Sequence, residues 1–352
     1  MFIDPHVHCR DGNQSYKETI KHALSVAYRV GMSAIANIGN GDPVVSNEED
    51  LNFYLDKVEK ANSPVDFFQW MGITSDPKQI EEAVRMWYEY PQVIGFKMFA
   101  GHSVGNLGII ERKKQRLVFE VLTKNDYKGV LMTHCEKEDY IEKEFDPKNP
   151  ISHCRNRPAI AEITSASDIL GDALESGYRG RIHIAHTSCP ETVEMRHRHP
   201  LKDKISVGVG PQHILMDDQL MYGGQGIFRK KNPPLRNMNR VMSMEDLLIK
   251  DNIDIYESDH APHARKEKEN PPYLSGFPQL PIFPLFLKFL KSKLSDKQIK
   301  KLTFERTKEI FSPKLDKVKP RPDVSLDNLE ELIKEVPALR KEYEYDAWEG
   351  VL

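Results

Sequence analysis

The chain has 352 residues, a formal net charge of −3, and 39% hydrophobic and 29% charged residues. This composition is typical of a soluble globular protein with a sizeable core, and the near-balanced charge gives no reason to expect a nucleic acid or an anionic membrane as a partner. No apolar run approaches the roughly 20 residues that span a bilayer, and the N-terminal segment lacks the basic start and apolar stretch of a signal peptide. We therefore expect a cytoplasmic protein.

Short apolar runs alternate with longer amphipathic ones along the chain. We predict strands at 2–8, 33–38, 65–70, 93–99, 129–133, 182–185, 205–209 and 253–257, and helices at 16–30, 47–61, 78–88, 113–124, 159–176, 191–197, 242–250, 280–294 and 296–302. A strand followed by a helix, repeated about eight times, is typical of a parallel sheet covered by helices. At this chain length we favour an α/β fold that is a closed TIM (β/α)8 barrel over an open doubly wound sheet.

Two irregular stretches and a tail interrupt this pattern. Residues 211–239 and 263–276 are rich in glycine, proline and charge, and long loops in a compact domain are often functional. We predict that residues 1–312 form the barrel and that residues 313–352 form a helical C-terminal extension packed on it. Within the extension, 326–336 has the spacing of an amphipathic helix that ends before Pro337.

The first predicted strand ends in His6-Val7-His8. Alternate residues of a strand face the same side, so the two imidazoles point together and can hold one metal ion. This pattern alone is only moderately specific, because two histidines at a strand end can also be ordinary surface or core residues.

Three more residues of ligand type lie at the ends of later predicted strands. His134 ends the fifth strand, His186 follows the sixth and Asp259 follows the eighth. Barrel enzymes place their active sites at this end of the strands, and four imidazoles with a carboxylate suit zinc or a similar divalent ion. His183 shares a strand with His186 at odd spacing, so we expect it to face away and to be structural.

Lys97 ends the fourth predicted strand and should face the same mouth of the barrel. A cationic lysine would be repelled by two divalent ions, whereas carboxylation by CO2 would turn its amine into a carbamate with two oxygens that can bridge them. Without carboxylation, Lys97 is an ordinary strand-end lysine or a group that binds a substrate carboxylate.

The four cysteines each lie near a histidine, and no pair has CxxC spacing: Cys9, Cys135, Cys154 and Cys189. Their wide spacing argues against a structural zinc ribbon, and a reducing cytosol disfavours a disulfide. We interpret them as small buried thiols near a site, with direct metal ligation as the weaker alternative.

A set of motifs in fixed order runs from residue 1 to about residue 290. They are His-Val-His-Cys-Arg-Asp-Gly (6–12), Gly-Phe-Lys-Met-Phe (95–99), Thr-His-Cys-Glu (133–136), His-Ile-Ala-His-Thr-Ser (183–188), Pro-Gln-His (211–213), Asn-Pro-Pro-Leu-Arg (232–236) and Ser-Asp-His-Ala-Pro-His-Ala-Arg (258–265). Together they resemble the dihydroorotases of the amidohydrolase superfamily.

The resemblance implies a role for each metal-site residue. His6 and His8, with Asp259, would hold one divalent ion, and His134 and His186 a second. Carboxylated Lys97 would bridge the two ions, with a hydroxide between them. Zinc is the expected metal, although such ligands also suit cobalt or manganese. Asp259 would be the catalytic residue, taking the hydroxide proton and passing it to the leaving amide nitrogen.

The resemblance also implies that Arg10, Asn40 and His263 bind the substrate carboxylate, with Asn37 as a competitor for the position of Asn40. Guanidinium suits this task because it binds a carboxylate through two hydrogen bonds. The implied reaction is the reversible closure of N-carbamoyl-L-aspartate to L-dihydroorotate in pyrimidine biosynthesis. The implied partner is this small substrate, and a homodimer and an association with aspartate transcarbamoylase are left open.

Several departures from the family pattern leave alternatives. The early His-x-His and the helical tail are similar to the compact dihydroorotases without a β-sandwich, whereas Asn232 to Arg236 is similar to the longer type. The segment that closes over substrate could be 101–108 or 211–231. The alternatives in function are another cyclic-amide hydrolase, similar to hydantoinase or allantoinase, and an inactive homologue that scaffolds aspartate transcarbamoylase.

Overall fold

A computed structural model describes residues 2–103 and 106–352 of the chain. Within these residues eight parallel strands form one sheet in sequence order. The strands are β1 (Phe2–Val7), β2 (Met32–Asn37), β3 (Asp66–Gly72), β4 (Val93–Ala100), β5 (Val130–Cys135), β6 (Arg181–Ile184), β7 (Ile205–Val209) and β8 (Ile255–Tyr256). A parallel bridge pairs Val7 with His260, and the His8 N–H donates to the His260 carbonyl oxygen at 2.8 Å. These contacts close the sheet, and the predicted TIM barrel is confirmed.

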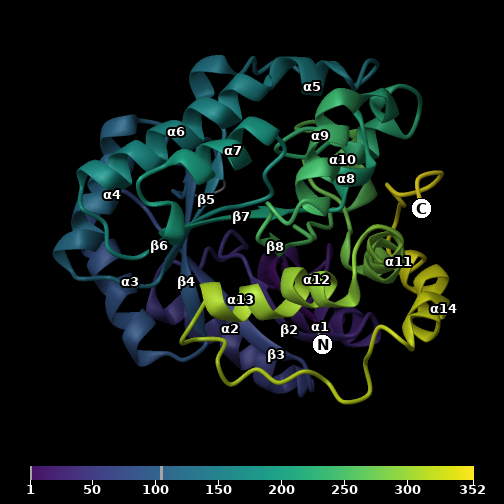
Figure 1. Cartoon of the computed structure of the whole chain (residues 1–352), viewed down its shortest axis with the longest axis horizontal. Coiled ribbons are helices and arrows are strands. Elements are labelled where there is room, and N and C mark those ends of the chain that lie inside the picture. Colours follow the sequence, from purple (N-terminus) through teal and green to yellow (C-terminus); the bar gives the residue numbers. More distant parts are fainter. Residues whose placement is uncertain (1, 104–105) are drawn as a thin grey trace.

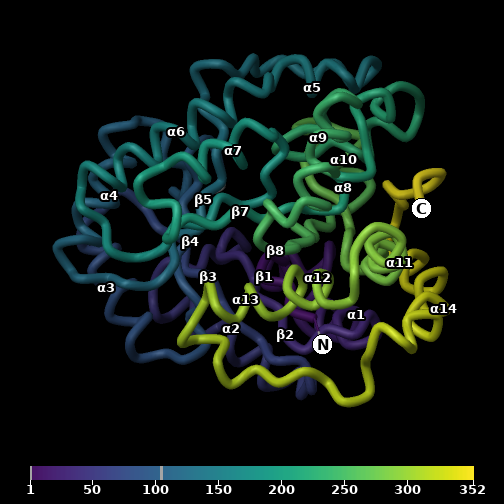
Figure 2. The backbone as a smooth tube through the Cα atoms, viewed as in Figure 1, coloured from purple at the N-terminus to yellow at the C-terminus, as the bar shows by residue number. Residues whose placement is uncertain are grey.

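Helices surround the strands on the outside (Figures 1 and 2). The long ones are α1 (Ile20–Arg29), α2 (Glu48–Ala61), α3 (Pro77–Glu89), α4 (Arg112–Lys124), α6 (Ala159–Glu175), α7 (Pro190–Arg198), α9 (Met238–Ile249) and α11 (Phe283–Lys293). Shorter ones are α5 (Ser152–Asn156), α8 (Gln212–Leu215), α10 (Arg265–Glu269), α12 (Asp296–Lys300) and α13 (Arg306–Ile310), and the tail carries α14 (Leu329–Arg340). None of the helices in the described ranges has the length and apolar character needed to cross a bilayer.

Side-chain caps fix where several helices begin. The predicted helix at 16–30 begins only at Ile20, because the Thr19 side chain accepts a hydrogen bond from the His22 N–H and ends the preceding turn. The predicted helix at 242–250 begins earlier, at Met238, because Asn237 caps it in the same way through the Arg240 N–H. Such polar caps satisfy main-chain donors that the first turn leaves free.

The tail helix differs from its prediction. The sequence predicted a helix over 326–336, but α14 runs from Leu329 through Pro337 to Arg340. Proline normally ends a helix because it lacks an N–H and crowds the preceding turn. Here the turn after Pro337 is kept because Leu339 is completely buried and the Arg340 Nε donates to Asp346 at 2.6 Å. The helix packs on α11, and the boundary at residue 312 stays a prediction.

The inside of the barrel is apolar at the end where the strands begin. Ile3, Ile94 and Val130, each within the first two residues of its strand, share a buried cluster with Phe311 from the turn after α13. The Phe311 ring lies edge-on to Trp70 with ring centroids 5.5 Å apart. Figure 1 shows α13 crossing in front of the strands. This segment closes that end of the barrel and leaves the opposite end for polar residues.

The packing of Phe311 generates a stability prediction. We expect Phe311→Ala to lower the free energy of unfolding by about 3–5 kcal/mol, because it removes a buried aromatic ring and leaves a cavity. Urea denaturation followed by circular dichroism measures this loss. Met242→Ala, at a side chain that is 59% exposed, is the control and should change stability by less than about 0.5 kcal/mol. Equal stability of the two variants would contradict the role of Phe311 in closing that end of the barrel.

Candidate metal centre

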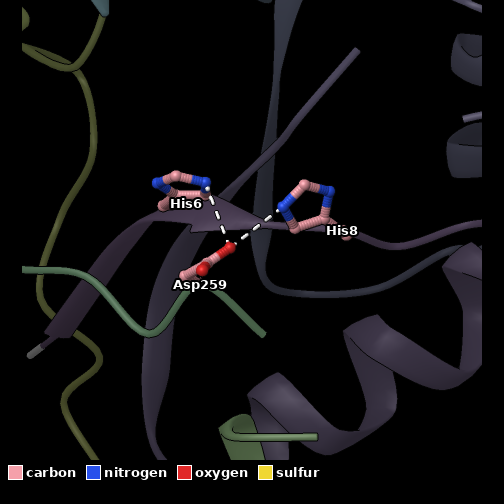
Figure 3. Close-up of side chains that lie close together, drawn as sticks. All are labelled: His6, His8 and Asp259. Atoms are coloured by element: carbon pink, nitrogen blue, oxygen red, sulfur yellow. Dashed lines mark hydrogen bonds and ion pairs between the residues drawn. The ribbon is translucent and has the colours of Figure 1, made fainter. Parts of the chain in front are cut away.

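Two histidines and one aspartate meet at the end of the barrel where the strands end. His6 lies near the end of β1, His8 follows that strand, and Asp259 follows β8. Figure 3 shows both imidazoles pointing toward the Asp259 carboxylate, whose Oδ1 lies 3.3 Å from His6 Nε2 and 3.0 Å from His8 Nε2. One ligand atom from each residue falls within 4.8 Å of the others. Such spacing suits a single divalent cation.

A second pair of imidazoles adjoins this group. His134 in β5 and His186 after β6 face each other, with His134 Nδ1 3.0 Å from His186 Nε2. The His186 ring also lies 5.1 Å from the ring of His6, measured between centroids. His186 and Asp259 both have a positive φ, at 38° and 49°. Such backbone strain in residues other than glycine is often found at functional sites.

Lys97 in β4 is completely buried. Its Nζ has no hydrogen-bond partner within the described residues and lies 5.3 Å from the Phe99 ring centroid. Burial lowers the pKa of Lys97 to about 8. Buried amines are normally paired, because an isolated charge in an apolar setting is costly. An unpartnered amine beside clustered metal-ligand residues is therefore the feature that carboxylation and metal binding would satisfy.

Burial favours the neutral form of three of the clustered histidines, His6, His8 and His186. Burial lowers the pKa of His8 to about 3, and it also lowers the pKa of His6 and His186. Neutral imidazole is the form that offers a lone pair to a metal. The donor set therefore fits divalent metal, and none of the four free cysteines belongs to the described cluster.

Glu257 bonds His6, and the sequence analysis did not identify it as a site residue. Its Oε2 lies 2.9 Å from His6 Nδ1 and 3.4 Å from His183 Nε2. A carboxylate at the second ring nitrogen fixes the orientation of a ligand histidine. His183 lies outside the metal cluster, bonded to Ser206 at 2.9 Å. Glu257 is two residues before Asp259 at a strand end, and this spacing was the available signal.

Glu136 orients His134, one of the second pair of histidines, in the same way. Its Oε2 lies 3.0 Å from His134 Nε2, which leaves His134 Nδ1 facing His186. Arg157 donates to both oxygens of Glu136, at 3.0 and 2.8 Å. Burial would raise the pKa of Glu136, but the charge of Arg157 and the bond to His134 hold it well below its usual value. Glu136 therefore stays ionised beside the site.

Lys231 pairs with Asp259 and was also missed. Its Nζ lies 3.0 Å from Asp259 Oδ2 and donates to the Asp259 carbonyl oxygen at 2.9 Å. Burial would raise the pKa of Asp259, but Lys231 and then His6 hold it well below its usual value. Lys231 comes from the irregular stretch at 211–239, where no periodicity shows which residues point inward.

The residues expected to bind a carboxylate line a cavity of about 360 Å³ whose lining also includes the clustered histidines. Arg10 Nη2 lies 3.1 Å from His263 Nε2, and we call the part of the lining formed by these two residues the carboxylate end. Asn40 also lines the cavity, with its Oδ1 2.7 Å from His8 Nδ1. Its competitor Asn37 is buried elsewhere and accepts from the Cys9 N–H.

Positive side chains outnumber negative ones in the lining of this cavity. Lys17, Lys230 and Lys231 line it together with Arg10. Both segments expected to close over substrate contribute to the lining, through His102 and Ser103 in one and Lys230 and Lys231 in the other. Residues 104 and 105 lie outside the described residues, and which segment closes stays a prediction. The lining fits an anionic small molecule.

Comparisons with known proteins relate the chain to curated dihydroorotases. No family model matches the chain. Over 317 residues it is 26% identical to a dihydroorotase of Lactobacillus gasseri, covering 88% of this chain and 72% of that protein. Over 287 residues it is 31% identical to a dihydroorotase of Aeropyrum pernix, covering 81% of this chain and 62% of that protein. The chain thus spans about two thirds of these relatives' lengths.

Solved structures share the fold. An L-hydantoinase from Arthrobacter aurescens superposes with a TM-score of 0.75 at 21% identity, over 89% of this chain and 71% of that one. At this identity the likeness supports the barrel architecture alone.

The unpartnered amine of Lys97 generates a metal-binding prediction. We expect Lys97→Ala to lose bound metal, because it would remove the group that we expect to bridge the two sets of histidines, and short carboxylic acids should partly restore metal content. Elemental analysis of the purified protein measures this. Lys114→Ala, at an exposed lysine of α4, is the control. Two metals per chain in Lys97→Ala would refute the bridging role.

Proposed function

The chain belongs to the dihydroorotase family of the amidohydrolase superfamily, and on this premise we propose that it interconverts N-carbamoyl-L-aspartate and L-dihydroorotate in pyrimidine biosynthesis. One observation carries the proposal. The same cavity is lined by a cluster of metal-ligand residues and by the Arg10–His263 pair. A cyclic amide that carries a carboxylate matches both groups of residues.

The residues of the centre fit two divalent ions, for which zinc is our expectation. His6, His8 and Asp259 would hold one ion, His134 and His186 the other, and carboxylated Lys97 would lie between them. The unpartnered Nζ of Lys97 and the neutral imidazoles support this assignment. Bound divalent ions supply Lewis acidity, which lowers the pKa of water and polarises an amide carbonyl.

The protein side chains orient the substrate and move the proton. The Arg10 guanidinium would bind the ring carboxylate and turn the scissile amide toward the histidines. Asp259 would accept the proton of the attacking water and return it to the leaving amide nitrogen, a general acid–base task. Lys231 and then His6 keep Asp259 ionised, which is the form that can accept a proton.

Two alternatives make different predictions. A hydantoinase or allantoinase would use the same centre on a ring without a carboxylate. The Arg10–His263 pair favours the carboxylated ring. An inactive homologue that scaffolds aspartate transcarbamoylase usually lacks ligand residues, whereas every expected ligand is present in this chain. A cytoplasmic location, a homodimer and an association with the transcarbamoylase are the accompanying hypotheses.

The direct test is hydrolysis of L-dihydroorotate, followed by loss of its ultraviolet absorbance, with metal content measured on the same sample. We expect turnover by protein that holds two metals per chain, and less activity on hydantoin and allantoin. Asp259→Asn should lower kcat by about 10²–10⁴-fold, because it removes the general base. Two metals with turnover of hydantoin alone would reject the proposed substrate and favour the alternative.

Arg10 provides a prediction about substrate recognition. We expect Arg10→Met to weaken binding of L-dihydroorotate by about 2–3 kcal/mol, roughly 30- to 150-fold in KM, because a charge-assisted contact is lost. Steady-state kinetics measures KM and kcat separately. Arg116→Met, on an exposed face of α4, is the control. An unchanged KM would remove Arg10 from the carboxylate site.

A further inference from the structure

A buried glutamate joins three distant segments behind the substrate cavity. Glu18 Oε2 lies 2.9 Å from His260 Nε2, and Glu18 Oε1 accepts a hydrogen bond from the Tyr343 hydroxyl at 2.7 Å. His260 Nδ1 accepts from the Gln279 N–H, so the ring proton is on Nε2 and is donated to Glu18. The Glu18 carbonyl oxygen accepts from the Asp11 N–H at 3.1 Å. Glu18 thereby connects the chain after Arg10, the chain after Asp259 and the C-terminal tail.

The ionised state of Glu18 makes this connection strong. Burial would raise its pKa, but the contacts with His260 and His22 hold the pKa of Glu18 at about 2. Hydrogen bonds to an ionised acceptor are roughly twice as strong as neutral ones. His22 also pairs with Glu342 at 2.9 Å, which is a second contact between the segment around Glu18 and the C-terminal tail.

The next residues of the tail contact the loop that carries His263. The Tyr345 hydroxyl donates to the Gly276 carbonyl oxygen at 3.3 Å, and its ring stacks on Phe228 with centroids 4.9 Å apart. The Gly276 N–H in turn donates to the Lys230 carbonyl oxygen at 2.8 Å. Gly276 and Lys230 both line the cavity, so Tyr345 supports its wall from behind.

The end of the tail is fastened to the loop before Lys230. Arg229 donates to the carbonyl oxygens of Ala347 and Glu349, at 3.0 and 2.7 Å. Trp348 is buried against Phe277, with ring centroids 6.2 Å apart. In Figure 2 the yellow C-terminal end lies beside the green segments around α10 and α11. We name residues 342–349 the C-terminal strap.

The strap supports the cavity without lining it. None of its residues is among the described side chains that face the cavity. The segments that it contacts carry Arg10 and His263, at the carboxylate end. Through Glu18 the strap also reaches His260, next to Asp259, but the main-chain bond between His8 and His260 holds that residue independently of the strap. The other metal-ligand residues lie at or just after the ends of barrel strands. Loosening the strap should therefore disturb substrate binding more than metal binding.

We propose that the C-terminal strap is a positioning element for the carboxylate end of the substrate cavity, with Tyr343 and Tyr345 as its positioning residues. The proposal rests on the proposed function for its kinetic consequences. The strap holds the Arg10 and His263 segments in the geometry that a carboxylate requires, and such precision depends on supporting hydrogen bonds. Neither tyrosine contacts substrate.

The test uses full-length Tyr343→Phe and Tyr345→Phe, which keep the aromatic rings and remove only the hydroxyls. Tyr178→Phe is the matched control, because its buried hydroxyl donates to the Gly129 carbonyl oxygen at 3.1 Å, before the start of β5. Measurements are kcat and KM for L-dihydroorotate, metal content, and hydrogen exchange of peptides that cover 10–18 and 263–276.

We expect each strap variant to raise KM by about fivefold, with kcat within about twofold and metal content unchanged, because the lost bond acts on orientation alone. Hydrogen exchange should become faster in the 10–18 peptide of Tyr343→Phe and in the 263–276 peptide of Tyr345→Phe, and it should stay unchanged in both peptides of Tyr178→Phe. Unchanged KM and exchange would overturn the proposal, and so would an equal effect of Tyr178→Phe or loss of metal. If wild-type protein does not hydrolyse L-dihydroorotate, the proposed function fails, and the exchange result alone supports or overturns the strap.

Discussion

The main-chain hydrogen bond from His8 to His260, 2.8 Å long, is the contact on which the centre depends. It joins the end of the first strand to the chain that follows the eighth, so the sheet closes on itself. His6 and His8 lie on the first-strand side of this contact, and Asp259 lies in the chain that follows the eighth strand. Closure is therefore what brings the carboxylate within 3.3 Å of His6 and 3.0 Å of His8. Because all strands are parallel, it also collects Lys97, His134 and His186 at the same end of the barrel.

The polar groups around this end compensate one another. Glu257 bonds His6, Glu136 bonds His134 and Arg157, and Lys231 bonds Asp259. A buried ion is tolerated when it is paired and hydrogen-bonded, and each of these carboxylates meets that condition. The same bonds fix which ring nitrogen of His6 and His134 faces the centre. Lys97 differs from these residues, since its amine has no partner among the described residues, and the same holds for Nδ1 of His186. The arrangement leaves a buried amine that carboxylation or a bound ligand would satisfy.

Residue periodicity predicted the parts of this structure that depend on local spacing. Alternation placed His6 and His8 on one face, and the repeated strand–helix pattern predicted the barrel. The roles of Arg10 and His263 came from resemblance, because nothing local indicates that residues in two loops meet. Lys231 acts through a tertiary contact from an irregular segment, so its partner could not be read from spacing, whereas the spacing of Glu257 from Asp259 was a signal that went unused. Pro337 was predicted to end a helix, and the buried Leu339 beyond it overrides that local preference.

The metal-ligand residues and the residues of the carboxylate end are held in position by different kinds of contact. The metal-ligand residues lie at or just after the ends of hydrogen-bonded strands, whose main-chain pairing fixes them. The carboxylate side is built on irregular chain, so its position must come from side-chain bonds to the main chain. Lys268 supplies three such bonds, to the carbonyl oxygens of Lys230, Leu274 and Gly276. Glu18 and the tail tyrosines supply the remainder. A barrel can thus keep one metal centre while changes in loops and tail alter which ring it accepts, since the two sets of contacts share few residues.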